Sequence, residues 1–205
     1  MILASRSPRR HQLLRMLGLD FDILPAKIEE NLDQTMIPSK LVCKLAIRKA
    51  KYIADKKPVS QVIVAADTIV VHQGSIFGQP ADISQAKQML RTLSDSEHHV
   101  YTGVAFVRTD QSGIISDKTD FFERTKVTFG SLTDHEIEAY TKSNSPLDKA
   151  GAYGIQDDWG AVFVSRIDGD FYNVVGLPIH KFYLHLKHFA PELLSNKYLQ
   201  DVQTD

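Results

Sequence analysis

The chain has 205 residues, of which 43% are hydrophobic and 24% are charged, and its formal net charge is −1. These proportions are ordinary for a globular protein, and the near-neutral charge argues against a strongly basic surface for a nucleic-acid polymer. No apolar run approaches the roughly 18 residues of a membrane-spanning helix, so we expect no membrane partner. The single cysteine, Cys43, excludes an intramolecular disulfide and favours the cytoplasm.

Strand and helix patterns alternate along the chain. In order we expect a strand at 2–4, a helix at 8–17, a strand at 21–24, a loop at 26–38, a helix at 39–54, a strand at 62–66 that continues extended to 71, a helix at 84–93, long strands at 100–107 and 121–129, a helix at 133–142, a strand at 161–167 and a helix at 178–189. This alternation predicts an α/β domain with a mixed sheet over 1–190, followed by a polar tail over 191–205.

A basic cluster, Ser5 to Arg10, stands at the expected start of the first helix. Two arginines in a first helical turn oppose the helix dipole, which costs roughly 0.3–1 kcal/mol each when they are exposed. A bound anion would reverse that sign, because helix N-termini and arginine side chains both bind phosphate. The cluster indicates either a phosphate site or a solvated basic turn.

Two further places combine a polar group with a buried element. Asp67 and Thr68 follow an apolar strand, and sites in open α/β sheets gather at the carboxyl ends of strands. An acid there can bind a divalent cation, orient a water molecule or simply cap a turn. Lys49 falls on the apolar stripe of the 39–54 helix, where a lysine either serves a site or extends its ammonium group to the surface.

The stretch from Lys149 to Gln156 contains two glycines and two alanines. Glycine lets the backbone approach a ligand closely, and Gln156 offers both a donor and an acceptor, as recognition of a base edge requires. A flexible surface loop is the alternative. The sequence contains no Walker, dinucleotide-binding or zinc-ligand pattern.

In this order, these clusters resemble the Maf family of nucleotide pyrophosphatases, once called septum-formation inhibitors. The similarity runs from Ile2 to about Leu186. The segments that carry it are Leu3-Ala4-Ser5 with Ser7-Pro8-Arg9-Arg10, Ala66-Asp67-Thr68, Leu147 to Gln156, Asp168-Gly169-Asp170 and Val175-Gly176-Leu177-Pro178.

The resemblance implies a mixed, highly twisted sheet flanked by helices, with two lobes around a central cleft, as in inosine triphosphatases. It also implies hydrolysis of unusual or pyrimidine nucleoside triphosphates to monophosphate and pyrophosphate. The run from Asp148 to Gln156 is similar to the branch that acts on dTTP and UTP. Mg²⁺ or Mn²⁺ is the implied cofactor, and a homodimer is the implied assembly.

The same resemblance implies roles for individual residues. Asp67 matches the family's proton acceptor, and Glu30 and Asp67 would hold the metal and activate water. Whether Asp67 acts on that water directly or through the metal stays open. The residues implied to bind the substrate are Ser5, Arg9, Arg10, Lys49, Thr68 and Gln156, of which Arg9, Thr68 and Gln156 match specificity positions.

Two segments depart from the family pattern. Gly78-Gln79-Pro80 stands where the family commonly has Gly-Lys-Pro. After Gln156, the segment 157–160 is one residue longer than usual and lacks its first glycine, which leaves the base preference open.

Two other functions therefore remain as alternatives. One is a nucleotide-binding regulator of septum formation without turnover, and the other is a related pyrophosphatase that prefers ITP or a methylated GTP. The acids Asp67 and Glu30 favour catalysis, because a pure binder gains nothing from carboxylates beside a polyphosphate.

Overall fold

The computed structural model of the chain describes residues 1–56, 59–142, 145–156 and 158–194. The strands in these ranges are β1 (Ile2–Leu3), β2 (Asp22–Ile23), β3 (Val62–His72), β4 (Ser75–Phe77), β5 (Glu97–Thr109), β6 (Ile115–Phe129) and β7 (Val164–Asp168). The α-helices are α1 (Pro8–Met16), α2 (Pro38–Ala54), α3 (Ile83–Leu93), α4 (Asp134–Thr141), α5 (Asp158–Phe163), α6 (Phe171–Val175) and α7 (Ile179–Phe189). Short 3₁₀ helices are η1 (Ser145–Asp148), η2 (Ala150–Ala152) and η3 (Pro191–Leu193).

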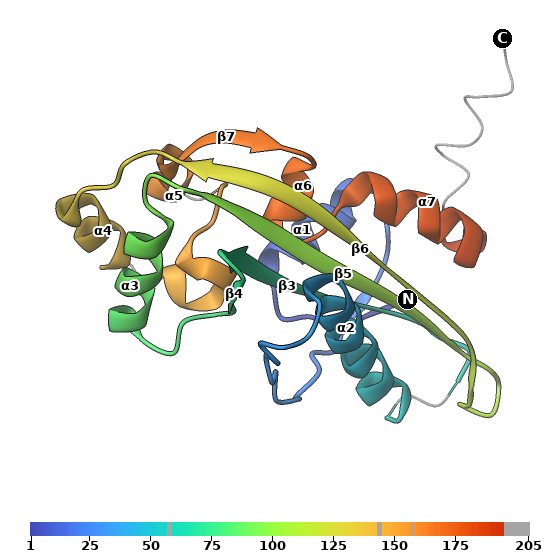
Figure 1. Cartoon of the computed structure of the whole chain (residues 1–205). Helices are drawn as coiled ribbons and strands as arrows, with labels where there is room; N and C mark the ends of the chain where they lie inside the picture. The colour runs from blue at the N-terminus through green and yellow to red at the C-terminus, as the bar shows by residue number, and fades with distance from the viewer. Residues whose placement is uncertain (57–58, 143–144, 157, 195–205) are drawn as a thin grey trace, which may run out of the picture.

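The strands of the described ranges form one mixed sheet in the order β2-β1-β3-β5-β6-β7, with β4 paired to the far part of β3. Strand β1 is parallel to β2 and to β3, whereas the other pairings are antiparallel. Figure 1 shows β3, β5 and β6 running as long curved strands through the whole molecule. The expected fold class, a mixed twisted sheet flanked by helices, is confirmed.

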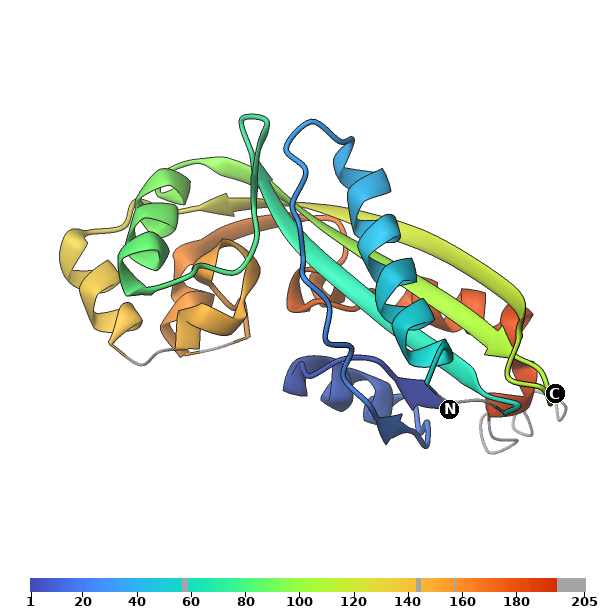
Figure 2. The ribbon, with the colours of Figure 1, turned by 90° about the horizontal axis from the view of Figure 1, so that it is seen from below.

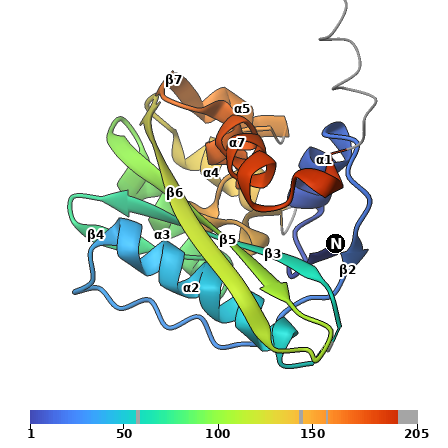
Figure 3. The ribbon, with the colours of Figure 1, turned by 90° about the vertical axis from the view of Figure 1, so that its right-hand side faces the viewer.

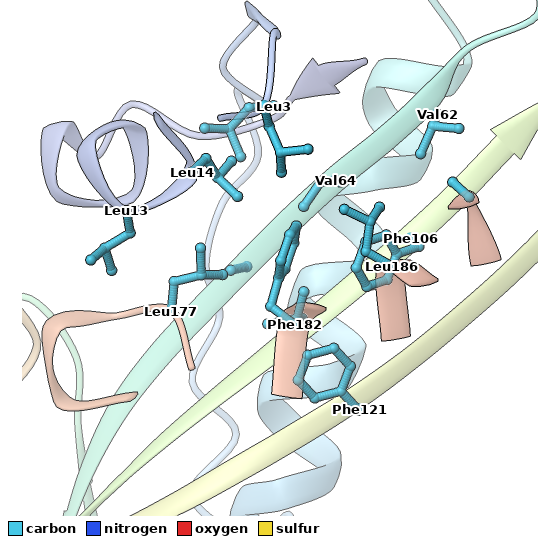
Figure 4. Packing of buried hydrophobic residues seen from close by; sticks show 14 of the residues in the cluster. Leu3, Leu13, Leu14, Val62, Val64, Phe106, Phe121, Leu177, Phe182 and Leu186 are labelled. Carbon is cyan, nitrogen blue, oxygen red and sulfur yellow. The ribbon is translucent and has the colours of Figure 1, made fainter. Parts of the chain in front are cut away.

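Helices cover both faces of the sheet, as Figure 3 shows. Helix α2 packs Ala46, Ala50 and Ile53 against one face of β3 and β5. On the other face, side chains from β1, α1 and α7 meet those of β3, β5 and β6, and Figure 4 shows Phe106 and Phe182 among them. Burial on both faces explains why β3 is a nearly continuous apolar run.

A separate apolar cluster fills the other end of the long strands. It joins α3 and α4 to η2, α5 and the distal parts of β3, β5 and β6, and Figure 2 shows these helices set apart from α1 and α2. Thr133 and Glu136, three residues apart, have the spacing that predicts a capping box, and they exchange the corresponding hydrogen bonds at the start of α4. The long strands thus connect two packed ends of the molecule.

Three local expectations are wrong. The segment 161–167 was expected to be one strand, but 158–163 is helix α5 and the strand begins at Val164, because a short apolar run fits a buried helix as well as a strand. A serine before a proline at the first helical position is typical of a helix N-cap, but the side chain of Ser7 makes no capping hydrogen bond. The strands β5 and β6 are longer than their apolar runs, because they pair with each other through polar residues as well.

The C-terminal segment is only partly described. Leu193 and Leu194 pack against the apolar cluster to which α1 and α7 contribute. Glu192 forms an ion pair with Arg108 at 2.8 Å. The remainder of the expected tail, 195–205, lies outside the described residues. Among the described helices, none combines the length and the apolar character needed to cross a bilayer.

The contact between α2 and β5 depends on Gly103. A Cβ added to Gly103 would lie 2.4 Å from the backbone carbon of Val42, so the helix or the strand would have to move. We expect Gly103→Ala to lower the free energy of unfolding by about 1–3 kcal/mol, the range for an overpacked core, in a chemical denaturation experiment. Gly130→Ala is the matched control, because its added Cβ would meet nothing closer than the Phe163 oxygen at 4.0 Å. Equal denaturation midpoints for the two variants would contradict this packing.

Candidate active site

The site lies along an unpaired edge of β3. Strand β1 pairs with β3 at Ile63 and Val64, and β4 pairs with it only from Val70 onward. Between these pairings, 65–69 has no described neighbour on that edge, although β5 pairs with the other edge throughout. A cavity of about 370 Å³ opens there, and it is lined by both faces of β3.

One side of the cavity holds a buried ionic group. Side chains alternate along β3, so Asp67 faces α2 together with Ile63 and Ala65. The Lys49 ammonium group, presented by α2, forms an ion pair with the Asp67 carboxylate. The same nitrogen lies 2.7 Å from Oε1 of Glu30, which belongs to the loop before α2. Lys49 is only 8% exposed and Asp67 only 3%, so the apolar-stripe position of the lysine serves a polar site.

The surroundings of Asp67 favour its protonated form more than water does. Burial raises the pKa of Asp67 above its usual value, and the nearby Glu30 carboxylate raises it further. The Lys49 and Arg10 side chains act in the opposite direction. A carboxylate with a raised pKa is a stronger base, which suits a group that accepts a proton near neutral pH.

On the opposite face of β3, Arg10 makes hydrogen bonds to three different segments of the chain. Its Nε donates to the carbonyl of Gly176 at 2.8 Å, and its two terminal nitrogens donate to Ser5 Oγ at 3.3 Å and Thr68 Oγ1 at 3.0 Å. Gly176 ends α6 with φ +119, a conformation that favours glycine and aims its carbonyl at the guanidinium. Burial lowers the pKa of Arg10, and the Asp67 carboxylate acts against this effect. Arg10 therefore ties α1, β3 and α6 together at the cavity.

A second arginine contacts the loop that the sequence marked as glycine-rich. Arg9 donates to the Asp148 carboxylate at 2.8 Å and to the Asp148 carbonyl at 3.0 Å. Gln79 donates to the same carbonyl at 3.1 Å, and Lys149 pairs with the carboxylate at 2.7 Å. Asp148 thus gathers three side chains from different segments at the mouth of the cavity.

The structure brings the sequence-predicted residues together. Arg9, Arg10, Glu30, Lys49, Asp67, Thr68 and Gln156 all line the cavity. Ser5 lines an adjoining cavity, which shares Arg9, Arg10, Glu30 and Lys49 with the first. Of the altered segment 157–160, residue 157 lies outside the described ranges and the rest begins α5.

Sequence reasoning missed several residues of the site. Arg6, Asp148 and Tyr153 line the cavity, but none of the three was predicted individually to bind the substrate. Arg6 belongs to the basic cluster, and the other two belong to the run from Asp148 to Gln156. The hydroxyl group of Thr102, on β5, is hydrogen-bonded to the hydroxyl group of Thr68. Its position in an ordinary alternating strand gives no signal that could have revealed it.

The two predicted metal ligands, Glu30 and Asp67, lie close together. Glu30 and Asp67 contact one ammonium nitrogen, so their oxygens approach a single point from two segments of the chain. No cluster of three or more histidine, cysteine or acidic side chains occurs among the residues with described positions. Mg²⁺ is commonly held by one or two carboxylates with substrate phosphates and water. The pair therefore fits a divalent cation that arrives with a polyphosphate, rather than a cage made by protein alone.

A buried Lys49–Asp67 ion pair, with the Glu30 carboxylate on its exposed side and the partly buried Arg9 and Arg10 nearby, defines a cleft that can bind a polyanion and perform acid–base chemistry. The chain belongs to the family described as Maf-like protein, whose model matches residues 1–189. The resemblance seen in the sequence is thereby confirmed.

Two relatives with a curated name are similar over nearly their whole length. The dTTP/UTP pyrophosphatase of Bacillus cereus (strain AH820) is 45% identical over 188 residues, covering 92% of this chain and 94% of that protein. The dTTP/UTP pyrophosphatase of Bacillus mycoides (strain KBAB4) is 45% identical over 192 residues, covering 94% and 96%. A solved nucleoside-triphosphatase / dITP/XTP pyrophosphatase from Mycobacterium abscessus matches with a TM-score of 0.42 and 13% identity, over 95% of this chain and 96% of that one.

Proposed function

We propose that this chain hydrolyses dTTP and UTP between the α- and β-phosphates, releasing a nucleoside monophosphate and pyrophosphate. The observation that carries the proposal is the buried Asp67, held by Lys49 at an open strand edge inside a cavity that Arg9 and Arg10 also line. The name dTTP/UTP pyrophosphatase, borne by relatives that are 45% identical, supports the choice of substrate.

Asp67 is the proposed proton acceptor. It takes a proton from a water molecule whose oxygen attacks the α-phosphorus, while the bond to the bridging oxygen breaks and pyrophosphate leaves with the electron pair. Burial raises the pKa of Asp67 and so strengthens it as a base, whereas the Lys49 ammonium group favours its ionised form and fixes the direction of its carboxylate. Lys49 is therefore a positioning residue for the base as well as a cation near the phosphates.

Glu30 and Asp67 are the proposed ligands of Mg²⁺ or Mn²⁺. Such a cation, when bound, would neutralise phosphate charge and stabilise the leaving pyrophosphate. The chain's own contribution is to hold the two carboxylates close together, which the shared contact with Lys49 accomplishes.

Arg9 and Arg10 are the proposed cations for the triphosphate. The two terminal nitrogens of Arg9 already donate to Asp148, one to its carboxylate and one to its backbone carbonyl, and phosphate oxygens suit the same fork. Arg10 has its charge fixed in place by three protein acceptors, so it contributes a preorganised field. Gln156, which lines the same cavity, is the proposed contact to the base edge.

Chromatography of reaction products tests this function and its alternatives together. UTP, dTTP, CTP, ITP and 7-methyl-GTP would each be incubated with the full chain and Mg²⁺ or Mn²⁺. We expect UTP and dTTP to give monophosphate and pyrophosphate faster than the other three. Diphosphate with orthophosphate would overturn the cleavage position, faster turnover of a purine would overturn the substrate, and binding without turnover would favour the septum regulator.

The replacement of the family lysine by Gln79 predicts a modest defect. Gln79 lines the cavity and donates a neutral hydrogen bond to Asp148, but it cannot neutralise phosphate charge. Hydrogen bonds to charged groups contribute about 1 kcal/mol more than neutral ones, so Gln79→Lys should raise kcat/KM for UTP several-fold. Steady-state kinetics at two ionic strengths would check this, with the larger gain at low salt. An unchanged or lower kcat/KM at both salt concentrations would rule out the missing-cation account.

Two further properties stay predictions. The homodimer suggested by the resemblance can be checked by light scattering coupled to size-exclusion chromatography. A cytoplasmic location follows from the lone cysteine and can be checked by fractionation of cells.

A further inference from the structure

In the hydrogen bond between the hydroxyl groups of Thr68 and Thr102, only one of the two can be the donor. Thr102 Oγ1 lies 3.0 Å from the backbone oxygen of Asn173, and a carbonyl oxygen can only accept. The single hydroxyl proton of Thr102 is therefore used in that bond. The 2.9 Å contact between the two threonine hydroxyls must then be donated by Thr68.

The far end of this chain of hydrogen bonds is held rigidly. The Asn173 side chain donates to the carbonyl of Val100 at 3.1 Å and to Thr125 Oγ1 at 3.0 Å, and its backbone N–H donates to Asp170 at 3.0 Å. Thr102 and Asn173 are both fully buried. The acceptor that fixes the Thr102 proton therefore cannot turn away without breaking the anchor of α6.

This direction determines what Thr68 can offer to a ligand. Its proton points inward to Thr102, and one oxygen lone pair receives the Arg10 N–H at 3.0 Å. A hydroxyl oxygen has two lone pairs, so one acceptor position remains and no donor does. Thr68 can receive a hydrogen bond from a ligand N–H or O–H, but it cannot donate one to a phosphate oxygen.

Apart from Arg10, which donates to it, Thr68 has apolar neighbours that suit a base. Val70, Val100 and Val174 line the same cavity, and all three belong to or pack against the apolar cluster at the distal end of the sheet. The ionic group of Asp67 lies on the opposite face of β3. Apolar walls with a few directed polar groups are the usual surroundings of a bound heterocycle.

We propose that Thr102 is a positioning residue for base selection, which acts by holding the Thr68 hydroxyl as a pure acceptor. An acceptor there favours uracil or thymine, whose N3 carries a hydrogen, over cytosine, whose N3 is itself an acceptor. This inference rests on the proposed pyrimidine-nucleotide function, and it adds a residue that never touches the substrate.

The test uses binding of two non-hydrolysable nucleotides, the α,β-methylene analogues of UTP and CTP, measured by calorimetry with Mg²⁺. Thr102→Val keeps the side-chain shape but removes the hydroxyl, so the Thr68 proton is released. The backbone oxygen of Asn173 still accepts a hydrogen bond from the Gly176 N–H at 3.0 Å in this variant, so the fold should be preserved. We expect the preference for the UTP analogue to fall roughly fivefold, the factor of one neutral hydrogen bond.

Two companion variants separate positioning from stability. Thr102→Ser retains the hydroxyl and should restore the preference of the original chain. Thr141→Val makes the same change at another buried threonine, whose hydroxyl donates to the Ile137 carbonyl at 2.7 Å in α4, and it should leave the preference unchanged.

An unchanged UTP-to-CTP preference in Thr102→Val would overturn the proposal while leaving the proposed function intact. An equal loss in Thr102→Val and Thr141→Val would assign the effect to general destabilisation and would also overturn it. If the original chain bound neither analogue, the proposal would fail together with the function on which it rests.

Discussion

Replacing Asp67 with asparagine should lower kcat for UTP by roughly 10²–10⁴-fold, the range for the loss of a positioned acid or base. The change removes the carboxylate that β3 presents to the Lys49 ammonium group, yet it preserves the size of the side chain. The amide can neither accept the proton of the attacking water nor serve as a charged metal ligand. Single-turnover kinetics with saturating UTP would measure the effect on chemistry apart from product release.

The matched control for this variant is Asp148→Asn. Asp148 also lines the cavity, but it contacts Arg9 and Lys149 rather than the Lys49 group. Burial acts to raise the pKa of Asp148, but its hydrogen bonds with Lys149 and Arg9 lower it overall. Its loss should change KM more than kcat. Near-original kcat in Asp67→Asn, with unchanged thermal stability, would mean that the proton acceptor lies elsewhere, and Glu30 would be the next residue to test.

Replacing Lys49 with methionine should lower kcat/KM at neutral pH by about 10²-fold. The ammonium group opposes the effect of burial on Asp67, so its removal raises the pKa of that carboxyl further. A higher pKa lowers the fraction of Asp67 that is ionised and able to accept a proton at a given pH. The acidic limb of the kcat/KM profile should therefore move to higher pH. A profile of reduced height with no shift would contradict the coupling between Lys49 and Asp67.

The stability of the same variant should depend on pH with a defined sign. A carboxyl whose pKa is raised in the folded state binds more protons there than in the unfolded chain, so its contribution is present at low pH and is lost as the pH rises through the folded pKa. In chemical denaturation experiments, the free energy of unfolding of Lys49→Met should therefore fall below that of the original chain by more at pH 8 than at pH 5. Lys49→Arg, which keeps the charge, is the control and should show a smaller difference between the two pH values.

Local patterns predicted the elements that carry the site. The apolar stripe of α2 placed Lys49 on the inner face, as observed. Asp67 was expected at the carboxyl end of an apolar strand, but it lies inside β3, where one edge of that strand is unpaired. Each prediction needed only the periodicity of one element, which residues near in sequence determine. The capping box of Thr133 and Glu136 was readable for the same reason.

The contacts between elements could not be predicted in this way. Nothing in the residues themselves shows that β1 leaves the edge of β3 after Val64, or that β4 joins it only at Val70, although this gap makes the cavity. The convergence of Glu30 on Lys49 depends on the path of an irregular loop. The role proposed for Thr102 depends on the register of β3 and β5, which places it opposite Thr68 and which the sequence alone does not show.

Hydrolysis in water enriched with ¹⁸O tests the central claim most directly, because it reports which phosphorus the water attacks. UTP would be turned over by the full chain with Mg²⁺ in labelled water, and mass spectrometry would locate the label in the products. The account predicts one ¹⁸O atom in UMP and none in pyrophosphate, since Asp67 directs water to the α-phosphorus. Label in pyrophosphate with none in UMP would place the attack on the β-phosphorus and contradict it.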